Sequence, residues 1–146
     1  MAKMARDVMT TDPTRCSRNT TLDEVAKLMR QFDCGEIPIV DTGDQPIGVV
    51  TDRDIVCRVV AEGKNPTAHT ADECMTQPVI TVSADASLDD VRLAMERHQI
   101  RRVLVVDERK CCVGIVSQAD VALAGRPGDV GNLVREVSRA TGQASH

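Results

Sequence analysis

Aromatic side chains are almost absent from this sequence. Trp and Tyr do not occur, and Phe32 is the only Phe among the 146 residues. This scarcity argues against a site built on aromatic stacking, including the platforms that bind single-stranded nucleic acid. A nucleobase bound here would therefore lie between aliphatic side chains. An excess of basic residues is also missing, since 18 Lys and Arg stand against 22 Asp and Glu for a net charge of −4. This balance does not suggest a nucleic-acid partner.

Long apolar runs are missing as well. No stretch approaches the roughly 20 residues that a membrane-spanning helix needs. The N-terminal segment Met1–Asp7 has no apolar core of the kind found in signal peptides. We therefore expect a cytoplasmic protein with no membrane partner.

The six cysteines contain no CxxC pair, which argues against a metal site, and the expected cytoplasmic location argues against a disulfide framework. Cysteine commonly serves as a small buried hydrophobic residue. The adjacent pair Cys111–Cys112 falls at the expected end of a hairpin turn, so we expect it to be the most exposed and most readily oxidised pair. A redox- or metal-responsive role for the cysteines stays open as the alternative function.

An internal repeat is the most informative feature of the chain. Residues 9–55 align without a gap on residues 75–121 at a constant offset of 66, and twelve of the 47 positions are identical. A repeat of this length indicates one supersecondary unit used twice. Two such units that cannot each bury a full core are expected to pack on each other, which creates a pseudo-twofold interface with two equivalent clefts.

Each repeat predicts the order strand, helix, strand, strand, helix. The first repeat is expected to contain a strand at 14–17, a helix after Thr21, strands at 37–40 and 47–50, and a helix at 52–62. Thr21 and Glu24 have the spacing of a capping box, and Gly35 is expected to end the first helix. The apolar face of that helix comprises Leu22, Val25, Leu28, Met29 and Phe32. The second repeat predicts strands at 79–83, 103–106 and 113–116, a helix after Ser87 and a last helix at 117–124.

The repeats set the expected boundaries. We predict a first repeat at 5–63, a linker at 64–72, a second repeat at 73–125, and a C-terminal helix and tail at 126–146. Apolar residues at i, i+3, i+4 and i+7 predict an amphipathic helix at Val130–Thr141. This helix is the best candidate for transmitting a conformational change, because it is additional to the repeats.

One motif occurs at the same place in both repeats. Where a strand runs into a helix, the chain reads Gly-h-h-(Thr/Ser)-x-x-Asp, with h apolar, at 48–54 and at 114–120. The hydroxyl residue is expected at the helix N-cap, and the free N–H groups of the first turn attract an anion. The carboxylate suits the two hydroxyls of a ribose, and the glycine is expected to let a ligand approach the strand. Thr-x-x-Asp and Ser-x-x-Asp are also ordinary helix caps that need no ligand.

Catalytic motifs are missing. The sequence has no Walker A loop, no HExxH, no GxSxG and no Cys–His pairing within the repeat. We therefore expect a protein that is not an enzyme.

The repeat resembles a tandem pair of cystathionine-β-synthase (CBS) domains, also called a Bateman module. The resemblance covers residues 5 to about 125. It rests on the openings Val8-Met9-Thr10 and Cys74-Met75-Thr76, on the strand segments at 35–41 and 100–107, and on both Gly-h-h-(Thr/Ser)-x-x-Asp boxes. The stretch 51–55 is similar to small stand-alone bacterial members. The resemblance implies an α/β (α+β) fold of two β-α-β-β-α units packed through their sheets.

The resemblance also implies a ligand, a partner and a set of site residues. An adenine-type nucleotide (AMP, ADP, ATP or a related adenosyl compound such as S-adenosylmethionine) would bind in one or both clefts as a regulatory ligand, with no obligatory cofactor. Asp54 and Asp120 would hold ribose hydroxyls, and Thr51 and Ser117 would meet phosphate or ribose. The base would rest near Thr14 and Cys16 in one cleft and near Ile80 and Val82 in the other. Ile37 and Val103 would add apolar walls, and Arg53, Arg101 and Arg102 are candidates for binding phosphate, with solvated surface charge as the alternative for Arg101 and Arg102. A homodimer and a regulated partner protein are expected.

Overall fold

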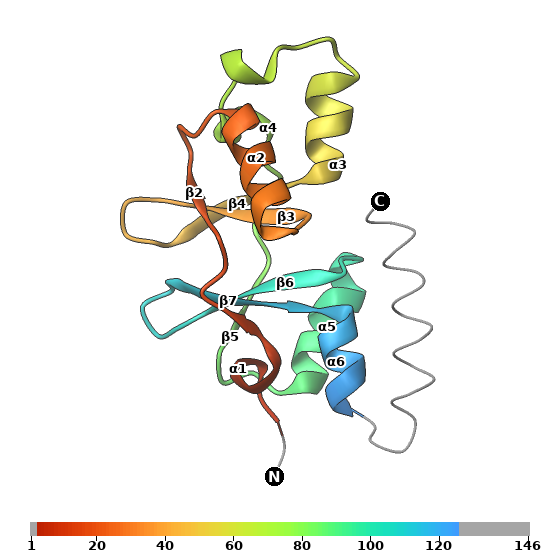
Figure 1. Cartoon of the computed structure of the whole chain (residues 1–146). Helices are drawn as coiled ribbons and strands as arrows, with labels where there is room; N and C mark the ends of the chain where they lie inside the picture. The colour runs from red at the N-terminus through yellow and green to blue at the C-terminus, as the bar shows by residue number, and fades with distance from the viewer. Residues whose placement is uncertain (1–2, 126–146) are drawn as a thin grey trace. The chain divides into compact units, whose positions relative to one another are not determined.

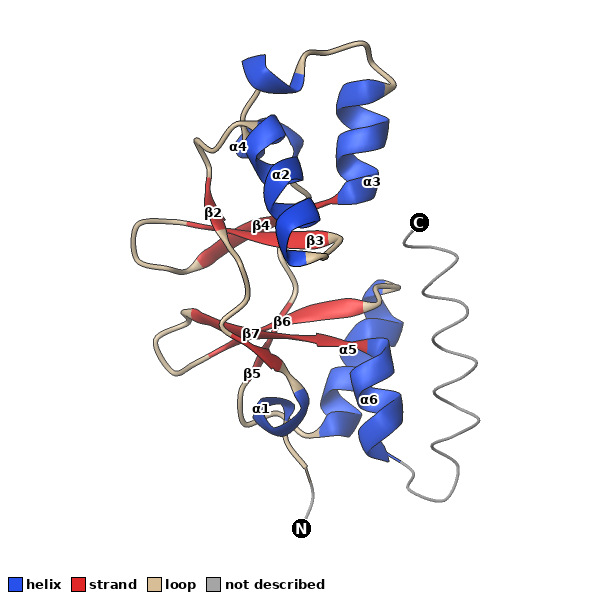
Figure 2. Ribbon diagram, viewed as in Figure 1, coloured by secondary structure: helices blue, strands red, loops and turns tan. Residues whose placement is uncertain are grey.

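A computed structural model describes residues 3–125, which form two compact units. The first-repeat unit comprises Pro13–Val79 together with Lys110–Cys112. The second-repeat unit comprises the described residues 3–12, 80–109 and 113–125. Each unit combines a β-sheet with helices (Figures 1 and 2), so the predicted mixed α/β class is confirmed. The predicted helix at Val130–Thr141 lies outside the described residues.

The first-repeat unit is built on a three-stranded sheet in the order β2-β3-β4, with β2 at Cys16–Ser17, β3 at Glu36–Val40 and β4 at Pro46–Thr51. β2 runs parallel to β3, and β3 runs antiparallel to β4. The helices α2 (Leu22–Phe32) and α3 (Asp52–Ile55) lie on one face of this sheet (Figure 2). The chain continues through the π-helical segment η1 (Val56–Val60), the 3-10 turn η2 (Pro66–Ala68) and α4 (Ala71–Cys74).

Apolar side chains at helical spacing on α2 and along β3 and β4 explain why this sheet and its helices pack together. Leu22, Val25 and Met29 recur at helical spacing on α2 and are buried against the apolar residues of β3 and β4. Ile37 and Val50, which lie opposite each other in the antiparallel ladder, are both fully buried. Burial of each such side chain stabilises the fold by about 1.5–3 kcal/mol relative to exposure.

The second-repeat unit is built on a four-stranded sheet in the order β1-β7-β6-β5. Its strands are β1 (Thr10–Thr11), β5 (Thr81–Ser83), β6 (Arg102–Val106) and β7 (Cys112–Ser117), and its helices are α1 (Ala5–Val8), α5 (Leu88–His98) and α6 (Gln118–Gly125). β5 runs parallel to β6, as β2 does to β3 in the other unit. The core joins Val91 and Met95 of α5 to Val103, Val105 and Val116 of the sheet.

The short segment that opens each repeat packs in the unit of the other repeat. Ala5 of α1 is fully buried in the second-repeat core, and its N–H donates to the Ala86 carbonyl at 2.8 Å. Ala71 of α4 is fully buried in the first-repeat core, and its N–H donates to the Thr20 carbonyl at 2.8 Å. The compact units therefore combine chain segments in a way that the repeat boundaries alone do not indicate.

Several local expectations for the first repeat are wrong in detail. Thr21 is the N-cap of α2 but its side chain accepts no capping hydrogen bond, so the predicted capping box with Glu24 does not form. The helix ends because Asp33, not Gly35, takes the left-handed conformation with φ 50°. Phe32 stands at the end of the predicted apolar face but is 53% exposed. The predicted helix at 52–62 is shorter than expected and changes from α-helical to π-helical hydrogen bonding at Val56.

Candidate functional site

Both Gly-h-h-(Thr/Ser)-x-x-Asp motifs form closed capping boxes. At the start of α3, the Asp54 N–H donates to Thr51 Oγ1 at 3.0 Å, and the Thr51 N–H donates to Asp54 Oδ2 at 2.9 Å. At the start of α6, the Asp120 N–H donates to Ser117 Oγ at 3.1 Å, and the Ser117 N–H donates to Asp120 Oδ2 at 2.9 Å. The expected N-cap position of the two hydroxyl residues is confirmed. Each box holds one carboxylate at a fixed place beside the end of a strand.

The first helical residue of each motif is anchored in the same way in both units, by a hydrogen bond to the residue that precedes the neighbouring strand. The Asp52 N–H donates to the Gly35 carbonyl at 2.9 Å, and the Gln118 N–H donates to the Arg101 carbonyl at 2.8 Å. Because Gly35 and Arg101 are equivalent positions of the repeat, the duplicated sequence reproduces the backbone of the motif. The side chains around that backbone differ between the two units.

The Asp54 carboxylate has partners beyond its own capping box. Thr76 Oγ1 donates to it, at 3.3 Å from Oδ1 and 3.2 Å from Oδ2. Arg58, one turn later on the helix, places Nε 3.8 Å from Oδ1. The Asp54 side chain is only 12% exposed, whereas Arg58 is 51% exposed and Thr76 is also exposed. Thr76 was not among the predicted site residues, although its identity with Thr10 in the repeat was a signal.

In each motif, a methionine side chain of the same unit packs beside the glycine and fills the space through which a ligand was expected to approach. A Cβ atom on Gly48 would lie 2.7 Å from Met75 Sδ, and a Cβ atom on Gly114 would lie 2.3 Å from Met9 Sδ. These distances are far below the contact distance of about 3.5–4.0 Å between carbon atoms. We expected the missing side chain of the glycine to let a ligand approach the strand. This expectation is wrong, because the methionine occupies the space beside the glycine Cα.

The remaining predicted residues of the first-repeat unit divide into core and surface. Ile37 is fully buried and Cys16 is 6% exposed, and both belong to the apolar core. Burial raises the pKa of the Cys16 thiol, with a smaller opposing effect from a Thr20 hydrogen bond. Thr14 is half-buried and Arg53 is exposed. Thr51, Asp54 and Arg53 therefore lie together at the start of α3, whereas Cys16 and Ile37 present no accessible side chain to a ligand.

The predicted residues of the second-repeat unit divide similarly. Val103 is 1% exposed and packs in the core. Ile80 and Val82 are half-buried beside it, and the Ile80 carbonyl accepts from the Leu104 N–H at 3.3 Å. Arg101 is exposed and Arg102 half-buried, and within residues 3–125 neither forms an ion pair. A cavity of about 380 Å³ in this unit lies elsewhere, lined by Arg6, Asp85, Asp107 and neighbouring residues.

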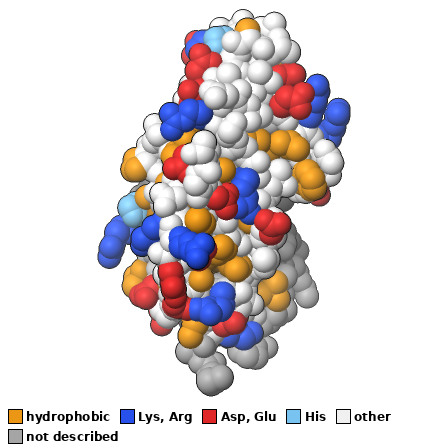
Figure 3. Space-filling model, turned by 90° about the vertical axis from the view of Figure 1, so that its left-hand side faces the viewer, with side chains coloured by type: hydrophobic (Ala, Val, Ile, Leu, Met, Phe, Trp, Pro, Cys, Tyr) orange, Lys and Arg blue, Asp and Glu red, His pale blue; other side chains and the backbone are white. Residues whose placement is uncertain are grey.

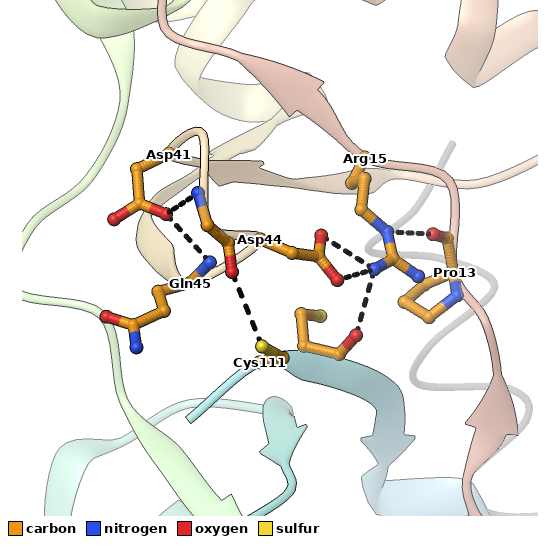
Figure 4. A network of polar contacts seen from close by, with 8 residues as sticks. Pro13, Arg15, Asp41, Asp44, Gln45 and Cys111 are labelled. Atoms are coloured by element: carbon orange, nitrogen blue, oxygen red, sulfur yellow. Dashed lines mark hydrogen bonds and ion pairs between the residues drawn. The ribbon is translucent and has the colours of Figure 1, made fainter. Parts of the chain in front are cut away.

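The pair Cys111–Cys112 was expected to be the most exposed, and this expectation is wrong, because Cys111 is half-buried and the exposed cysteine is Cys57. All six are free thiols, but Cys112 is only 1% exposed. The Cys111 thiol donates to the Gly43 carbonyl at 3.3 Å. Arg15 crosses the same loop, where its Nη1 donates to both carboxylate oxygens of Asp44, at 2.8 and 2.6 Å, and to the Cys112 carbonyl at 2.9 Å (Figure 4). The pair is thus held within the first-repeat unit by hairpin contacts.

The described part of the chain brings no three His, Cys, Asp or Glu side chains into a group that could hold a metal ion. Within residues 3–125 no helix combines the length and apolar character that crossing a bilayer requires. On the face shown in Figure 3, Lys and Arg side chains are interspersed with Asp and Glu.

Comparisons with known proteins match both repeats. The sequence model of the CBS domain family matches residues 5–61 and again residues 71–126. The chain is 40% identical over 116 residues to protein MK0525 of Methanopyrus kandleri, which covers 80% of this chain but 57% of that protein. It is 41% identical over 118 residues to Hypoxic response protein 1 of Mycobacterium tuberculosis, covering 81% of this chain and 82% of the relative.

Solved structures agree with the sequence matches. The crystal structure of Hypoxic Response Protein I with two coordinated zinc ions matches with a TM-score of 0.75 at 39% identity, covering 82% of this chain and 97% of that chain. The CBS domain pair of protein MJ0100, in complex with 5′-methylthioadenosine and S-adenosyl-L-methionine, matches with a TM-score of 0.74 at 30% identity, covering 84% of this chain and 94% of that chain.

Proposed function

Because this chain belongs to the CBS domain family and carries two CBS domains, we propose that it is a cytoplasmic regulatory module that binds an adenosyl ligand. The observation that carries the proposal is the likeness to the MJ0100 domain pair, which was solved with two adenosyl compounds. The repeated carboxylate of the motif gives this likeness a chemical basis, since a ribose offers two adjacent hydroxyls to such an acceptor.

Each motif supplies part of the recognition that an adenosyl ligand needs. Asp54 and Asp120 accept hydrogen bonds from the ribose hydroxyls, while Thr51 and Ser117 stand beside them at the N-caps. Arg53 is exposed on the first turn of α3, where a positive charge is otherwise unfavourable beside the helix dipole. A phosphate or carboxylate of the ligand would neutralise that charge. The ligand class accordingly includes AMP, ADP, ATP and S-adenosylmethionine.

A regulatory role without chemistry of its own fits the state of the carboxylates. In both units the motif Asp already accepts a backbone hydrogen bond of its capping box. Each carboxylate thereby holds the start of a helix and keeps further acceptor positions for hydroxyl groups. We infer that the ligand is bound and released unchanged.

We further propose that the regulatory unit is a homodimer formed through helices. Phe32 on α2 and Val56 and Val60 on η1 are 53%, 56% and 62% exposed, and they belong to the same unit. Exposed apolar side chains on helical segments of one unit are candidates for a contact surface, since apolar patches mark protein–protein interaction sites. A second copy of this chain offers the same apolar side chains, so a symmetric contact would bury both sets.

Ligand binding reaches a partner protein only if the ligand binds one conformation of the module more tightly than another. The two Thr/Ser-x-x-Asp motifs lie at the starts of α3 and α6. The apolar side chains of η1 follow α3 without a break. A ligand held at Asp54 therefore acts on the same helical segment that carries Val56 and Val60.

Isothermal titration calorimetry with AMP, ADP, ATP and S-adenosylmethionine tests the proposal. We expect micromolar binding of at least one compound that is lost when both Asp54→Asn and Asp120→Asn are present. Asp52→Asn is the matched control, because Asp52 lies on the same helical turn as Asp54 but, among residues 3–125, its carboxylate accepts only from the Arg53 N–H, at 2.8 Å. Absence of heat with every compound, or equal binding by the double variant, would refute an adenosyl ligand at these motifs.

Light scattering tests the dimer. We expect wild-type protein at twice the monomer mass and a shift toward monomer for Phe32→Ser. A monomeric wild-type protein at micromolar concentration would refute the dimer and leave the ligand proposal to be judged by calorimetry.

A further inference from the structure

The two motif carboxylates are equivalent in sequence but unequal in their surroundings. Thr76 lies opposite Val49 in an antiparallel bridge, and its hydroxyl reaches both oxygens of Asp54. Thr10 lies opposite Ile115 at the equivalent register of the repeat. Among residues 3–125, the Thr10 hydroxyl makes no hydrogen bond to Asp120. The same residue type in the same backbone pairing thus has a carboxylate partner in one unit only.

A second difference reinforces the first. Arg58 follows Asp54 by one helical turn and places Nε 3.8 Å from its Oδ1. The equivalent position after Asp120 is Ala124, which carries no charge. Arg58 Nη1 also donates to the carbonyls of Cys74 and Met75, at 3.0 and 3.3 Å. Arg58 therefore fixes the backbone of Cys74 and Met75, and this backbone positions Thr76 beside the Asp54 carboxylate.

The number of hydrogen bonds that a carboxylate can accept explains why these different surroundings should change the affinity for a ligand. An ionised carboxylate has about four acceptor sites on its two oxygens. At Asp54 the Thr51 N–H and the Thr76 hydroxyl use two of these sites, and the Arg58 guanidinium lies 3.8 Å from Oδ1 as an ion-pair partner. At Asp120 the only partner within residues 3–125 is the Ser117 N–H, on Oδ2. A vicinal diol needs two acceptor positions at once, and among residues 3–125 Asp120 has more of them unoccupied than Asp54.

We propose that Thr76 is a built-in competitor for the diol-accepting carboxylate of Asp54, so that the first-repeat motif binds an adenosyl ligand more weakly than the Asp120 motif of the second-repeat unit. This inference rests on the proposed function, because it concerns the same ligand class at the same two motifs. The Thr76 hydroxyl occupies the position that one ribose hydroxyl would take on Asp54.

The competition also makes the first-repeat motif a switch. A ligand that binds Asp54 must release Thr76, and Thr76 lies two residues after the end of α4, whose Ala71 and Cys74 belong to the same core. Occupancy of Asp54 therefore loosens the segment that Arg58 and Thr76 secure. The second-repeat motif has no such hydroxyl to release among its described neighbours, so its occupancy leaves the local contacts of Asp120 unchanged.

Two threonine variants and two aspartate variants test the inference. Thr76→Val removes the competing hydroxyl from an exposed position and keeps the β-branched shape and the backbone bridge to Val49. Thr10→Val makes the same change at the equivalent register, where no carboxylate contact is lost. Asp54→Asn and Asp120→Asn each retain an acceptor for the capping N–H while removing the second acidic oxygen. The probes are AMP, ATP and S-adenosylmethionine in calorimetry, with 2′-deoxy-AMP to report the need for a diol.

We expect the tighter binding event of the wild-type protein to be lost in Asp120→Asn and kept in Asp54→Asn. Thr76→Val should strengthen the Asp54-dependent event about threefold to tenfold, the change that corresponds to losing one competing hydrogen bond of ordinary strength. Thr10→Val should match the wild-type protein. Binding of 2′-deoxy-AMP should be weaker than binding of AMP in every protein that retains an aspartate.

The outcomes separate this inference from the function on which it rests. Wild-type binding that depends on Asp54 rather than Asp120, or a Thr76→Val variant indistinguishable from Thr10→Val, would overturn the competition while the adenosyl function stands. Absence of binding by all five proteins would overturn both. Circular-dichroism melts of each variant confirm that a change in affinity does not come from unfolding.

Discussion

Replacing Gly114 by Ala places a new methyl group inside a space that Met9 already fills. The added Cβ would lie 2.3 Å from Met9 Sδ, 2.8 Å from its Cγ and 3.0 Å from its Cβ. The thioether can rotate away, but Met9 Cβ is fixed to the backbone, so part of the overlap requires a shift of the chain. Overpacking of this kind typically costs about 1–3 kcal/mol. Lower flexibility of the unfolded chain offsets about 0.4–1 kcal/mol of that.

We therefore expect Gly114→Ala to lower the free energy of unfolding by about 1–2 kcal/mol, which corresponds to roughly 2–8 °C in Tm for a chain of this size. Gly48→Ala should cost somewhat less, because its closest contacts are longer, with Met75 Sδ at 2.7 Å, Met75 Cγ at 3.0 Å and the Thr76 carbonyl oxygen at 3.1 Å. Gly43→Ala is the matched control. Its added Cβ would meet only Asp41 Oδ1, at an ordinary 3.5 Å, and its Tm should stay within about 2 °C.

Urea and thermal unfolding of ligand-free protein provide the assay, followed by a double-mutant cycle with Met9→Ala. Truncating Met9 removes two of the three clashing atoms, so the pair should show a favourable coupling of about 1 kcal/mol. The competing explanation is that the glycine serves ligand approach. In that case Gly114→Ala would unfold at the wild-type temperature or above, and only ligand affinity would fall. Such a result would refute the assignment of this glycine to methionine packing.

Two further substitutions and one labelling experiment probe other parts of the structure. Glu73→Gln should lower Tm at pH 7 but not at about pH 3. The hydrogen bond from the Thr70 backbone N–H, together with smaller effects of neighbouring groups, holds the Glu73 pKa below its ordinary 4.5. The stability that ionised Glu73 contributes is therefore present above its unfolded-state pKa and disappears as pH falls through its folded-state pKa. Equal losses of Tm at both pH values would contradict this. Native alkylation should modify exposed Cys57 first and Cys74 roughly tenfold or more slowly, because burial of Cys74 raises its thiol pKa; equal rates would contradict the burial. Arg15→Gln should cost about 1–2 kcal/mol in urea unfolding, since its half-buried guanidinium makes charged hydrogen bonds; an unchanged midpoint would show that the hairpin contacts contribute nothing.

The repeat made the element order and the capped carboxylates predictable. The offset of 66 placed Thr51 and Ser117 at equivalent N-caps, and both boxes form with the predicted partners Asp54 and Asp120. Short-range patterns of this kind depend on residues three or four apart, whose geometry a helix start fixes. The strands were predictable for a similar reason, because Ile37 and Val50 belong to apolar runs bounded by polar turns.

The exchange of opening segments was not predictable from the same information. Met9 and Met75 are identical, and each precedes an identical Thr, so nothing local says which unit each methionine enters. The structure places Met9 against Gly114 and Met75 against Gly48, which is a choice made by long-range packing. The role of the motif glycine was misjudged for the same reason: its neighbour comes from a distant segment. Asp33 and Gln99 end their helices in the left-handed conformation, which neither residue type favours as glycine would.

The difference between the two motifs lies in side-chain contacts, because both opening segments pair with the motif strand at the equivalent register. Thr76 and Arg58 lie around one carboxylate, whereas Ala124 stands at the position equivalent to Arg58. Duplication fixes where the acceptor oxygens stand, but the residues that arrive from elsewhere decide whether those oxygens are available. A duplicated binding motif therefore need not yield two equal sites. The carboxylate with fewer internal partners binds a diol at lower cost, and the carboxylate with more partners links binding to the release of its neighbours.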